Sequence, residues 1–188
     1  MTKNIMIVGV GGQGTLLASR ILGNTVIGEG YDVKLSEVHG MSQRGGSVVT
    51  YVKYGDKVYS PIIGKGEADI ILAFEMLEAY RAMPYLKKDG VMIANTQEID
   101  PMPVITGAAA YPENIPSKLE SKIKLVQVDA LTKAQEAGNI KAVNVVLIGV
   151  MAKNTDISYE KWIETIKKTV PEKFLDANLK AFDLGYNL

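Results

Sequence analysis

At 188 residues the chain is long enough for one substantial core but short for two, so we expect a single domain over residues 1–188. Basic and acidic residues number 21 each, and this zero formal charge argues against nucleic acid or an anionic membrane as a partner. The chain has no cysteine, which excludes disulfides, thiol catalysis and a cysteine-ligated iron–sulfur cluster within it. With no signal-like or membrane-spanning run and no metal-ligand motif, we expect a cytoplasmic protein without a metal site of its own.

The first elements are typical of an α/β protein. Asn4–Val10 is a compact apolar run closed by glycines, which predicts a buried parallel strand. Leucine and isoleucine then recur at helical spacing and predict a helix over Gly14–Gly28. Asp32–Val38 supplies a second strand.

A departure from a plain dinucleotide-binding domain follows. Ser47–Tyr54 and Lys57–Ile63 are two β-rich runs around Gly55-Asp56. Glycine at the first central position of a two-residue turn favours type II′ geometry. These two runs therefore predict an antiparallel hairpin beside the parallel strands.

Alternation of strand and helix then resumes. The expected elements are a strand, an interrupted helix and a second strand: Asp69–Phe74, Glu75–Leu86 with its break at Pro84, and Val91–Asn95 after an Asp89-Gly90 turn. Glu98–Pro116 holds four prolines, so we expect an irregular crossing loop with a short extended piece at Val104–Ile105.

The remaining chain is predicted to be mostly helical. After a strand at Ile123–Asp129, helices are expected at Ala130–Ala137, Val143–Lys153, Tyr159–Val170 and Glu172–Leu184. Two apolar stripes on the last pair predict core packing: Trp162, Ile163, Ile166 and Val170, then Phe174, Leu175, Leu179 and Phe182. The fold class predicted is α/β, a single Rossmann-like domain whose mainly parallel sheet carries an antiparallel hairpin and whose C-terminal third is helical.

The first candidate site is the run Gly9, Gly11, Gly12, Gln13 and Gly14, in which the first, second and last glycines match G-x-G-x-x-G. Glycine allows a tight turn and close backbone approach, and a helix N-terminus offers free N–H groups to an anion. A phosphate is the natural guest. Glu37 lies near the place where NAD or FAD proteins carry an acidic residue, but the polar loop after it replaces the usual crossover. Three interpretations stay open: NAD or FAD binding, tight packing alone, and an anion or nucleotide-like group from a partner or cofactor.

The second candidate site is the polar loop that contains the only histidine. His39 could donate a hydrogen bond or exchange a proton, and Arg44 could clamp a carboxylate or phosphate, although a structural or interface role for both is an alternative. The loop's further candidate binding residues, with the strand residue before it, are Glu37, Ser42, Gln43, Gly45 and Gly46. Because loops that follow parallel strands open on one edge of a sheet, we expect this loop and the glycine turn to line one crevice. Glu75 and Glu78 are interpreted as favouring a helix N-terminus, with Glu75 kept as a residue at the rim of the site.

Three motifs in order give a family resemblance: GVGGQG at Gly9–Gly14, SEVHGMSQRGGSVVTYVKYG at Ser36–Gly55 and AFEMLEAYR at Ala73–Arg81. Together with NVVLIGVMA at Asn144–Ala152, they resemble the gamma-type small subunit of 2-oxoacid:ferredoxin oxidoreductases over nearly the whole chain. VHGMSQRGGS is most similar to the small (beta) subunit of the indolepyruvate:ferredoxin oxidoreductase branch.

This resemblance implies a subunit that is inactive alone. It would belong to a complex that decarboxylates an aryl 2-oxoacid and forms acyl-coenzyme A. Thiamine diphosphate and iron–sulfur clusters would lie in a larger partner subunit, which passes electrons to ferredoxin. Coenzyme A phosphates would be the guests of the Gly9–Gly14 turn. The alternatives are a stand-alone NAD- or FAD-binding Rossmann protein and a non-catalytic assembly scaffold.

Overall fold

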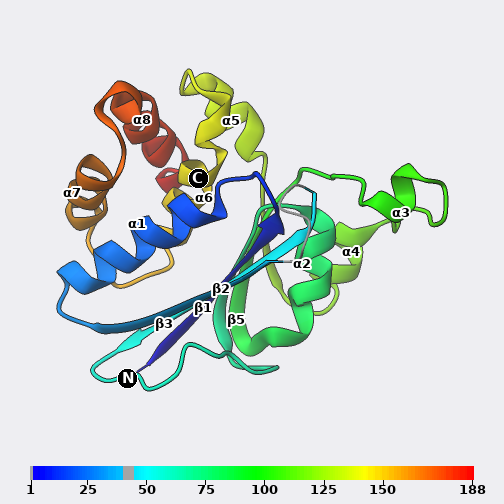
Figure 1. Ribbon diagram of the computed structural model, residues 1–188, viewed down its shortest axis with the longest axis horizontal. Helices are drawn as coiled ribbons and strands as arrows, with labels where there is room; N and C mark the ends of the chain where they lie inside the picture. The colour runs from blue at the N-terminus through cyan, green and yellow to red at the C-terminus, as the bar shows by residue number, and fades with distance from the viewer. Residues whose placement is uncertain (1, 40–44) are drawn as a thin grey trace.

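A computed structural model describes residues 2–39 and 45–188, with only the backbone of His39. In these residues one six-stranded sheet has the order β2-β3-β1-β4-β5-β6 (Figure 1). The strands are β1 (Lys3–Val10), β2 (Asp32–His39), β3 (Ser47–Gly55), β4 (Ala68–Ala73), β5 (Leu86–Asn95) and β6 (Lys124–Val128). From β1 to β6 the pairs are parallel, whereas β3 is antiparallel to both β1 and β2. The predicted α/β class, with a mainly parallel sheet and an antiparallel part, is confirmed.

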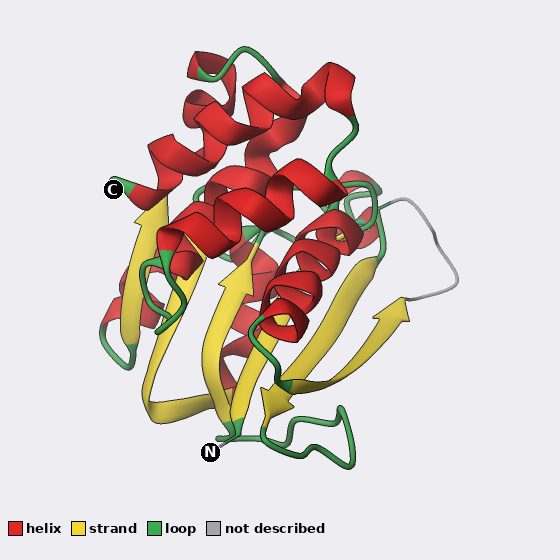
Figure 2. Cartoon of the chain, turned by 90° about the vertical axis from the view of Figure 1, so that its left-hand side faces the viewer, coloured by secondary structure: helices red, strands yellow, loops and turns green. Residues whose placement is uncertain are grey.

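Helices cover both faces of the sheet (Figure 2). One face packs against α1 (Thr15–Gly28), α5 (Ala130–Glu136), α6 (Val143–Ala152), α7 (Tyr159–Thr169) and α8 (Leu175–Tyr186). The other packs against α2 (Met76–Ala82) and α4 (Ile115–Glu120). Shorter helical segments lie in the connections: the α-helix α3 (Met102–Ile105) and the 3-10 helices η1 (Met83–Tyr85), η2 (Ile140–Ala142) and η3 (Glu172–Phe174).

The central position of β1 in the sheet explains why its sequence is apolar without alternation. Ile5 and Ile7 belong to the core under α1 and α6, whereas Met6 and Val8 belong to the core under α2. All four are at most 2% exposed, because a central strand is covered on both faces. The apolar run at Asn4–Val10 thus gives the strand its central place.

The prediction that Ser47–Tyr54 pairs with Lys57–Ile63 in a hairpin is wrong. Strand β3 lies between β2 and β1 and pairs with both along nearly its whole length. The paired residues run from Lys3 to Val10 in β1 and from Asp32 to His39 in β2. Lys57–Ile63 forms no strand; Pro61 lacks the N–H that a ladder requires, and Val58 instead donates its N–H to Asp32 Oδ2 at 2.8 Å.

Two smaller predictions also differ. Asp89-Gly90 lies inside β5, at a point where the register against β4 shifts, and not in a separate turn. Val104–Ile105 ends the short helix α3 and is not extended, because prolines at 101 and 103 suit the N-cap and first turn of a helix. The four C-terminal helices are confirmed within a few residues of their predicted bounds.

Helices α6 and α8 approach each other closely through glycines. A Cβ added at Gly149 would lie 2.3 Å from the Phe182 carbonyl oxygen. One added at Gly185 would lie 2.0 Å from the Val146 carbonyl oxygen. Both distances are far below van der Waals contact, so this helix pair depends on the absence of two side chains.

Candidate functional site

The glycine turn joins β1 to α1 at the carboxyl edge of the sheet. A Cβ at Gly9 would lie 2.9 Å from Phe74 Cβ, and one at Gly14 would lie 2.6 Å from Asn144 Nδ2. These two glycines permit close packing, as the packing interpretation expects. Gly12 differs, because its φ of 103° is left-handed and a Cβ there would meet nothing within 4 Å. The open part of the turn is therefore at Gly12.

The N-terminus of α1 is available to a ligand. Gly14 is the N-cap residue with a φ of 82°, and no side chain within residues 2–38 and 45–188 caps this end. The first N–H groups of a helix have no acceptor within the helix, and they carry its partial positive charge. The turn thus offers donors to an acceptor group, as the motif predicts.

The described end of the polar loop contacts the glycine turn, whereas the crevice expected between the two loops stays a prediction. The Gly11 N–H donates to the Gly46 carbonyl at 2.9 Å, and the Gly45 N–H donates to the Gly11 carbonyl at 3.4 Å. A hollow of about 380 Å³ lies there, lined by Gly11, Gly12, Gly14, Thr15, Leu16, Glu37 and Val48. Ser42, Gln43, Arg44 and the His39 side chain lie outside the described part of the chain.

Glu37 does not have the place that the NAD or FAD interpretation requires. Because β3 separates β2 from β1, Glu37 lies one strand further from the glycine turn than a neighbouring strand would put it, about 5 Å more. Its Oε2 accepts a hydrogen bond from the Thr50 hydroxyl at 3.3 Å. The dinucleotide interpretation is therefore not supported.

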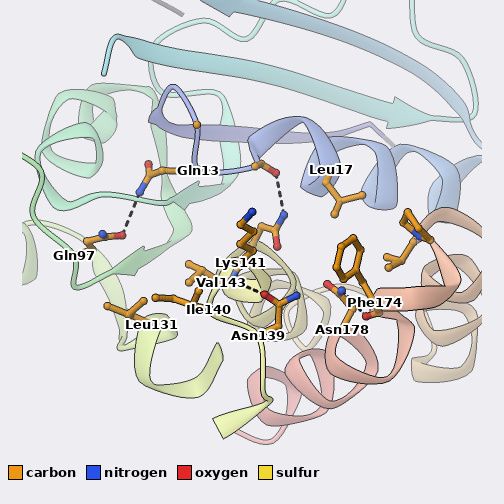
Figure 3. A pocket seen from close by; sticks show the side chains of 15 residues that line it. Gln13, Leu17, Gln97, Leu131, Asn139, Ile140, Lys141, Val143, Phe174 and Asn178 are labelled. Carbon is orange, nitrogen blue, oxygen red and sulfur yellow. Dashed lines mark hydrogen bonds between the residues drawn. The ribbon is translucent and has the colours of Figure 1, made fainter. Parts of the chain in front are cut away.

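A larger hollow of about 590 Å³ opens on the other side of the glycine turn (Figure 3). Its lining residues come from the turn, α1, the end of β5 and the C-terminal helices: Gly12, Gln13, Gly14, Leu17, Gln97, Leu131, Asn139, Ile140, Lys141, Val143, Asn144, Val170, Pro171, Phe174 and Asn178. Sequence reasoning found its glycines and Gln13 but missed the rest, because no local motif marks residues that only the fold brings together.

The larger hollow has polar and apolar side chains at both ends. Figure 3 shows Gln13 and Gln97 at one end, with Leu131 and Ile140 on the same side. Leu17 and Phe174 lie at the other end with Asn178, and Lys141 lies between the two ends. Among the lining side chains that the structure describes, Lys141 is the only charged one and none is a carboxylate. Phe174, expected in a core stripe, is 42% exposed and forms a wall of this hollow. The site suits a ligand that is anionic in one part and apolar or aromatic in another.

A network of amide side chains supports the end of the hollow at Gln13 and Gln97. Gln13 Oε1 accepts the Val10 N–H at 2.8 Å, so its Nε2 is directed to the Phe74 carbonyl, at 3.0 Å. Asn95, which is fully buried, donates to the same carbonyl at 3.1 Å. This network links the ends of β1, β4 and β5 and keeps the turn in register with the sheet.

Glu75 and Glu78 have the helix-terminus role that the sequence predicts. Glu75 is the N-cap of α2 and accepts the Glu78 N–H at 2.8 Å. Glu78 accepts from the Ser47 hydroxyl at 2.6 Å and pairs with Arg81 at 2.5 Å. Glu75 is 1% exposed and lines neither hollow, so its predicted place at the rim is wrong. It also accepts a hydrogen bond from the Tyr111 hydroxyl. Burial, and to a smaller extent this hydrogen bond, raises the pKa of the Tyr111 phenol.

Two further structural findings concern residues 2–39 and 45–188. They contain no group of three or more His, Cys, Asp or Glu side chains arranged to hold a metal ion. No helix among them is both long enough and apolar enough to cross a membrane.

The sequence profile of the family described as "Pyruvate ferredoxin/flavodoxin oxidoreductase" matches residues 4–188. The chain belongs to this family. Another family member, the indolepyruvate oxidoreductase subunit IorB of Pyrococcus horikoshii, is 47% identical over 188 residues, covering 97% of this chain and 93% of that protein. The resemblance to small subunits of the indolepyruvate branch is therefore confirmed.

Solved structures extend the family likeness to the fold. The pyruvate oxidoreductase subunit PORC of Thermotoga maritima has a TM-score of 0.76 and 23% identity, over 99% of this chain and 96% of that one. The 2-oxoglutarate:ferredoxin oxidoreductase of Magnetococcus marinus, solved with 2-oxoglutarate, coenzyme A and succinyl-CoA, has a TM-score of 0.74 and 17% identity. It matches 99% of this chain and 30% of its own length, so the fold also occurs within a longer oxidoreductase polypeptide.

Proposed function

We propose that this chain is the small subunit of an indolepyruvate:ferredoxin oxidoreductase and that it forms the coenzyme A side of the active site. The complex would convert an aryl 2-oxoacid and coenzyme A to acyl-coenzyme A and carbon dioxide, with two electrons passed to ferredoxin. Thiamine diphosphate and iron–sulfur clusters, expected in the larger partner subunit, supply decarboxylation and electron transfer when bound. The chain is expected to be inactive alone.

The observation that carries the proposal is the larger hollow beside the glycine turn. Its volume of about 590 Å³ lies within the range of roughly 300–1,000 Å³ of small-molecule sites. The N–H groups at the start of α1 and the Lys141 ammonium are suited to phosphate oxygens, and Phe174 offers an aromatic surface for the apolar part of the ligand. Relatives named as indolepyruvate oxidoreductase subunits support the choice of 2-oxoacid.

In this proposal the described residues bind and orient the acyl acceptor and perform no bond-making step. Lys141 and the α1 N-terminus hold the phosphates, and the apolar wall excludes water from the remainder of the ligand. His39 and Arg44 remain candidate catalytic residues on the neighbouring loop, and Ser42, Gln43, Gly45 and Gly46 remain candidate contacts to coenzyme A.

The test uses the assembled complex, after mass-spectrometric identification of the partner that co-purifies with this chain. Lys141→Met is expected to raise the KM for coenzyme A about tenfold, the effect of losing one charge-assisted hydrogen bond. The rate of 2-oxoacid oxidation with an artificial electron acceptor and no coenzyme A should not change. Lys180→Met, which removes an exposed lysine of α8, is the matched control. Equal kinetics in both variants, or turnover by this chain alone, would contradict the proposal; loss of assembly with normal kinetics would favour the scaffold alternative.

A further inference from the structure

Gln97 lies two residues after the end of β5, at the same end of the larger hollow as Gln13. It is half-buried and belongs to the hollow's lining. Its side-chain oxygen, Oε1, accepts hydrogen bonds from Gln13 Nε2 and from Asn95 Nδ2, both at 3.4 Å. Two donors therefore converge on one side of this amide.

The orientation of the Gln97 amide follows from its neighbours. Gln13 must direct its nitrogen toward Gln97 because its oxygen accepts the Val10 N–H. Asn95 must do the same because its oxygen accepts the Ala130 N–H at 3.2 Å. Since both neighbours present donors, Gln97 has to present its oxygen to them. Its NH₂ group, for which the described residues supply no acceptor, is left for a ligand at the rim of the hollow.

The backbone around Gln97 is held from the opposite face of the sheet by a buried carboxylate. Glu75 Oε1 accepts the Ile99 N–H at 3.1 Å and the Tyr111 hydroxyl at 2.5 Å. The Met76 N–H donates to the backbone carbonyl of Gln97 at 3.0 Å. The N-cap and first residue of α2 thus hold the backbone at Gln97 and at Ile99. Because Glu75 is 1% exposed, no water can replace these contacts.

We propose that Gln97 determines specificity by donating a hydrogen bond to an anionic phosphate oxygen of the ligand, and that Glu75 is the positioning residue that holds Gln97 in place. This inference rests on the proposed function, because it takes coenzyme A as the ligand. The anionic choice follows from the described part of the lining, in which Lys141 is the only charged side chain and carboxylates are absent. A ligand that presents a cation or a second donor at this point would be rejected, since no lining carboxylate could accept from it.

The experiment compares near-isosteric variants of Gln97 in the assembled complex. Gln97→Glu keeps an oxygen for Gln13 and Asn95 but replaces the NH₂ with a charged oxygen, and should raise the KM for coenzyme A at least about tenfold. Gln97→Met removes the donor without adding charge and should raise it about threefold to fivefold. Gln135→Glu, which adds the same charge on the exposed surface of α5, should leave it unchanged. With pantetheine, which lacks the phosphates beyond the thiol arm, the Gln97→Glu effect should disappear.

The positioning role of Glu75 is tested by non-additivity. Glu75→Gln alone should raise the KM for coenzyme A without changing the coenzyme A-independent oxidation rate. Added to Gln97→Met, it should raise the KM no further, because its effect acts through Gln97. If Glu75→Gln fails to assemble, Tyr111→Phe removes one of the donors to Glu75 and provides the same comparison.

The outcomes separate this inference from the function on which it rests. If Lys141→Met and Gln97→Glu both leave the KM unchanged, the proposed function is wrong. If only Lys141→Met raises it, coenzyme A binds in the hollow and the role of Gln97 is wrong. Additive effects of Glu75→Gln and Gln97→Met would overturn the positioning role alone.

Discussion

Replacing Gly149 with alanine should destabilise the chain more than its small size suggests. The new Cβ would lie 2.3 Å from the Phe182 carbonyl oxygen and 2.8 Å from the Tyr186 backbone nitrogen. Restoring ordinary contact requires α6 and α8 to separate by about 1 Å, and overpacking of this kind costs about 1–3 kcal/mol and sometimes more. The helix propensity of alanine returns about 1 kcal/mol. Because both clashes are with backbone atoms, which no rotamer change can move, we take the upper end of that range, about 3 kcal/mol, and expect a net loss of about 2 kcal/mol.

Gly23→Ala is the matched control for this prediction. Gly23 also lies inside a helix, but a Cβ there would meet nothing within 4 Å, so alanine should stabilise the chain by up to about 1 kcal/mol. For a chain of this size, 1 kcal/mol corresponds to a Tm change of roughly 2–4 °C. Urea titration followed by circular dichroism measures both variants. If Gly149→Ala proves as harmless as Gly23→Ala, the close approach of α6 and α8 is not a source of stability.

Two further predictions concern the pH dependence of stability. Asp129 caps α5, and hydrogen bonds from the Thr132 N–H and hydroxyl lower the pKa of its carboxyl below the ordinary 3.8. As an N-cap, Asp129 should contribute about 1 kcal/mol to the free energy of unfolding. This contribution should be complete above pH 3.8 and be lost as the pH falls through the lower pKa of the folded state. The urea midpoints of Asp129→Ala and of the unaltered chain should therefore converge in acid. The Tyr159 hydroxyl donates a hydrogen bond to Asp183. This hydrogen bond, and to a smaller extent burial, raises the pKa of Tyr159 to about 12. The cost of Tyr159→Phe, about 1 kcal/mol below pH 10, should shrink as the pH rises from 10 toward 12, and a constant difference in Tm across that range would refute this reading.

The sequence predicts those parts of the fold that depend on local pattern. The run Asn4–Val10 and the glycines after it place β1, the turn and α1 correctly, because burial on both faces and helix initiation leave local signals. The partner of Ser47–Tyr54 could not be obtained in this way, since several antiparallel partners satisfy the same alternation and only the completed sheet selects β1 and β2.

The candidate site divides along the same line. Gly12 and Gln13 could be found because they belong to a motif, whereas Gln97, Lys141 and Phe174 lie on separate segments that meet only after the helices pack. Phe174 shows the limit most clearly. Its spacing fits an apolar stripe, but it falls at the end of η3, where the chain turns into α8 and leaves the ring exposed.

The packing of β1 has a consequence for synthesis of the chain. Ile5 and Ile7 are synthesised long before Trp162 and Phe182, which belong to the core that covers them. That side of the sheet therefore stays incompletely covered until α8 has emerged from the ribosome, and the growing chain exposes apolar surface until then. A polypeptide cut short before α8 should depend on chaperones rather than on its own core.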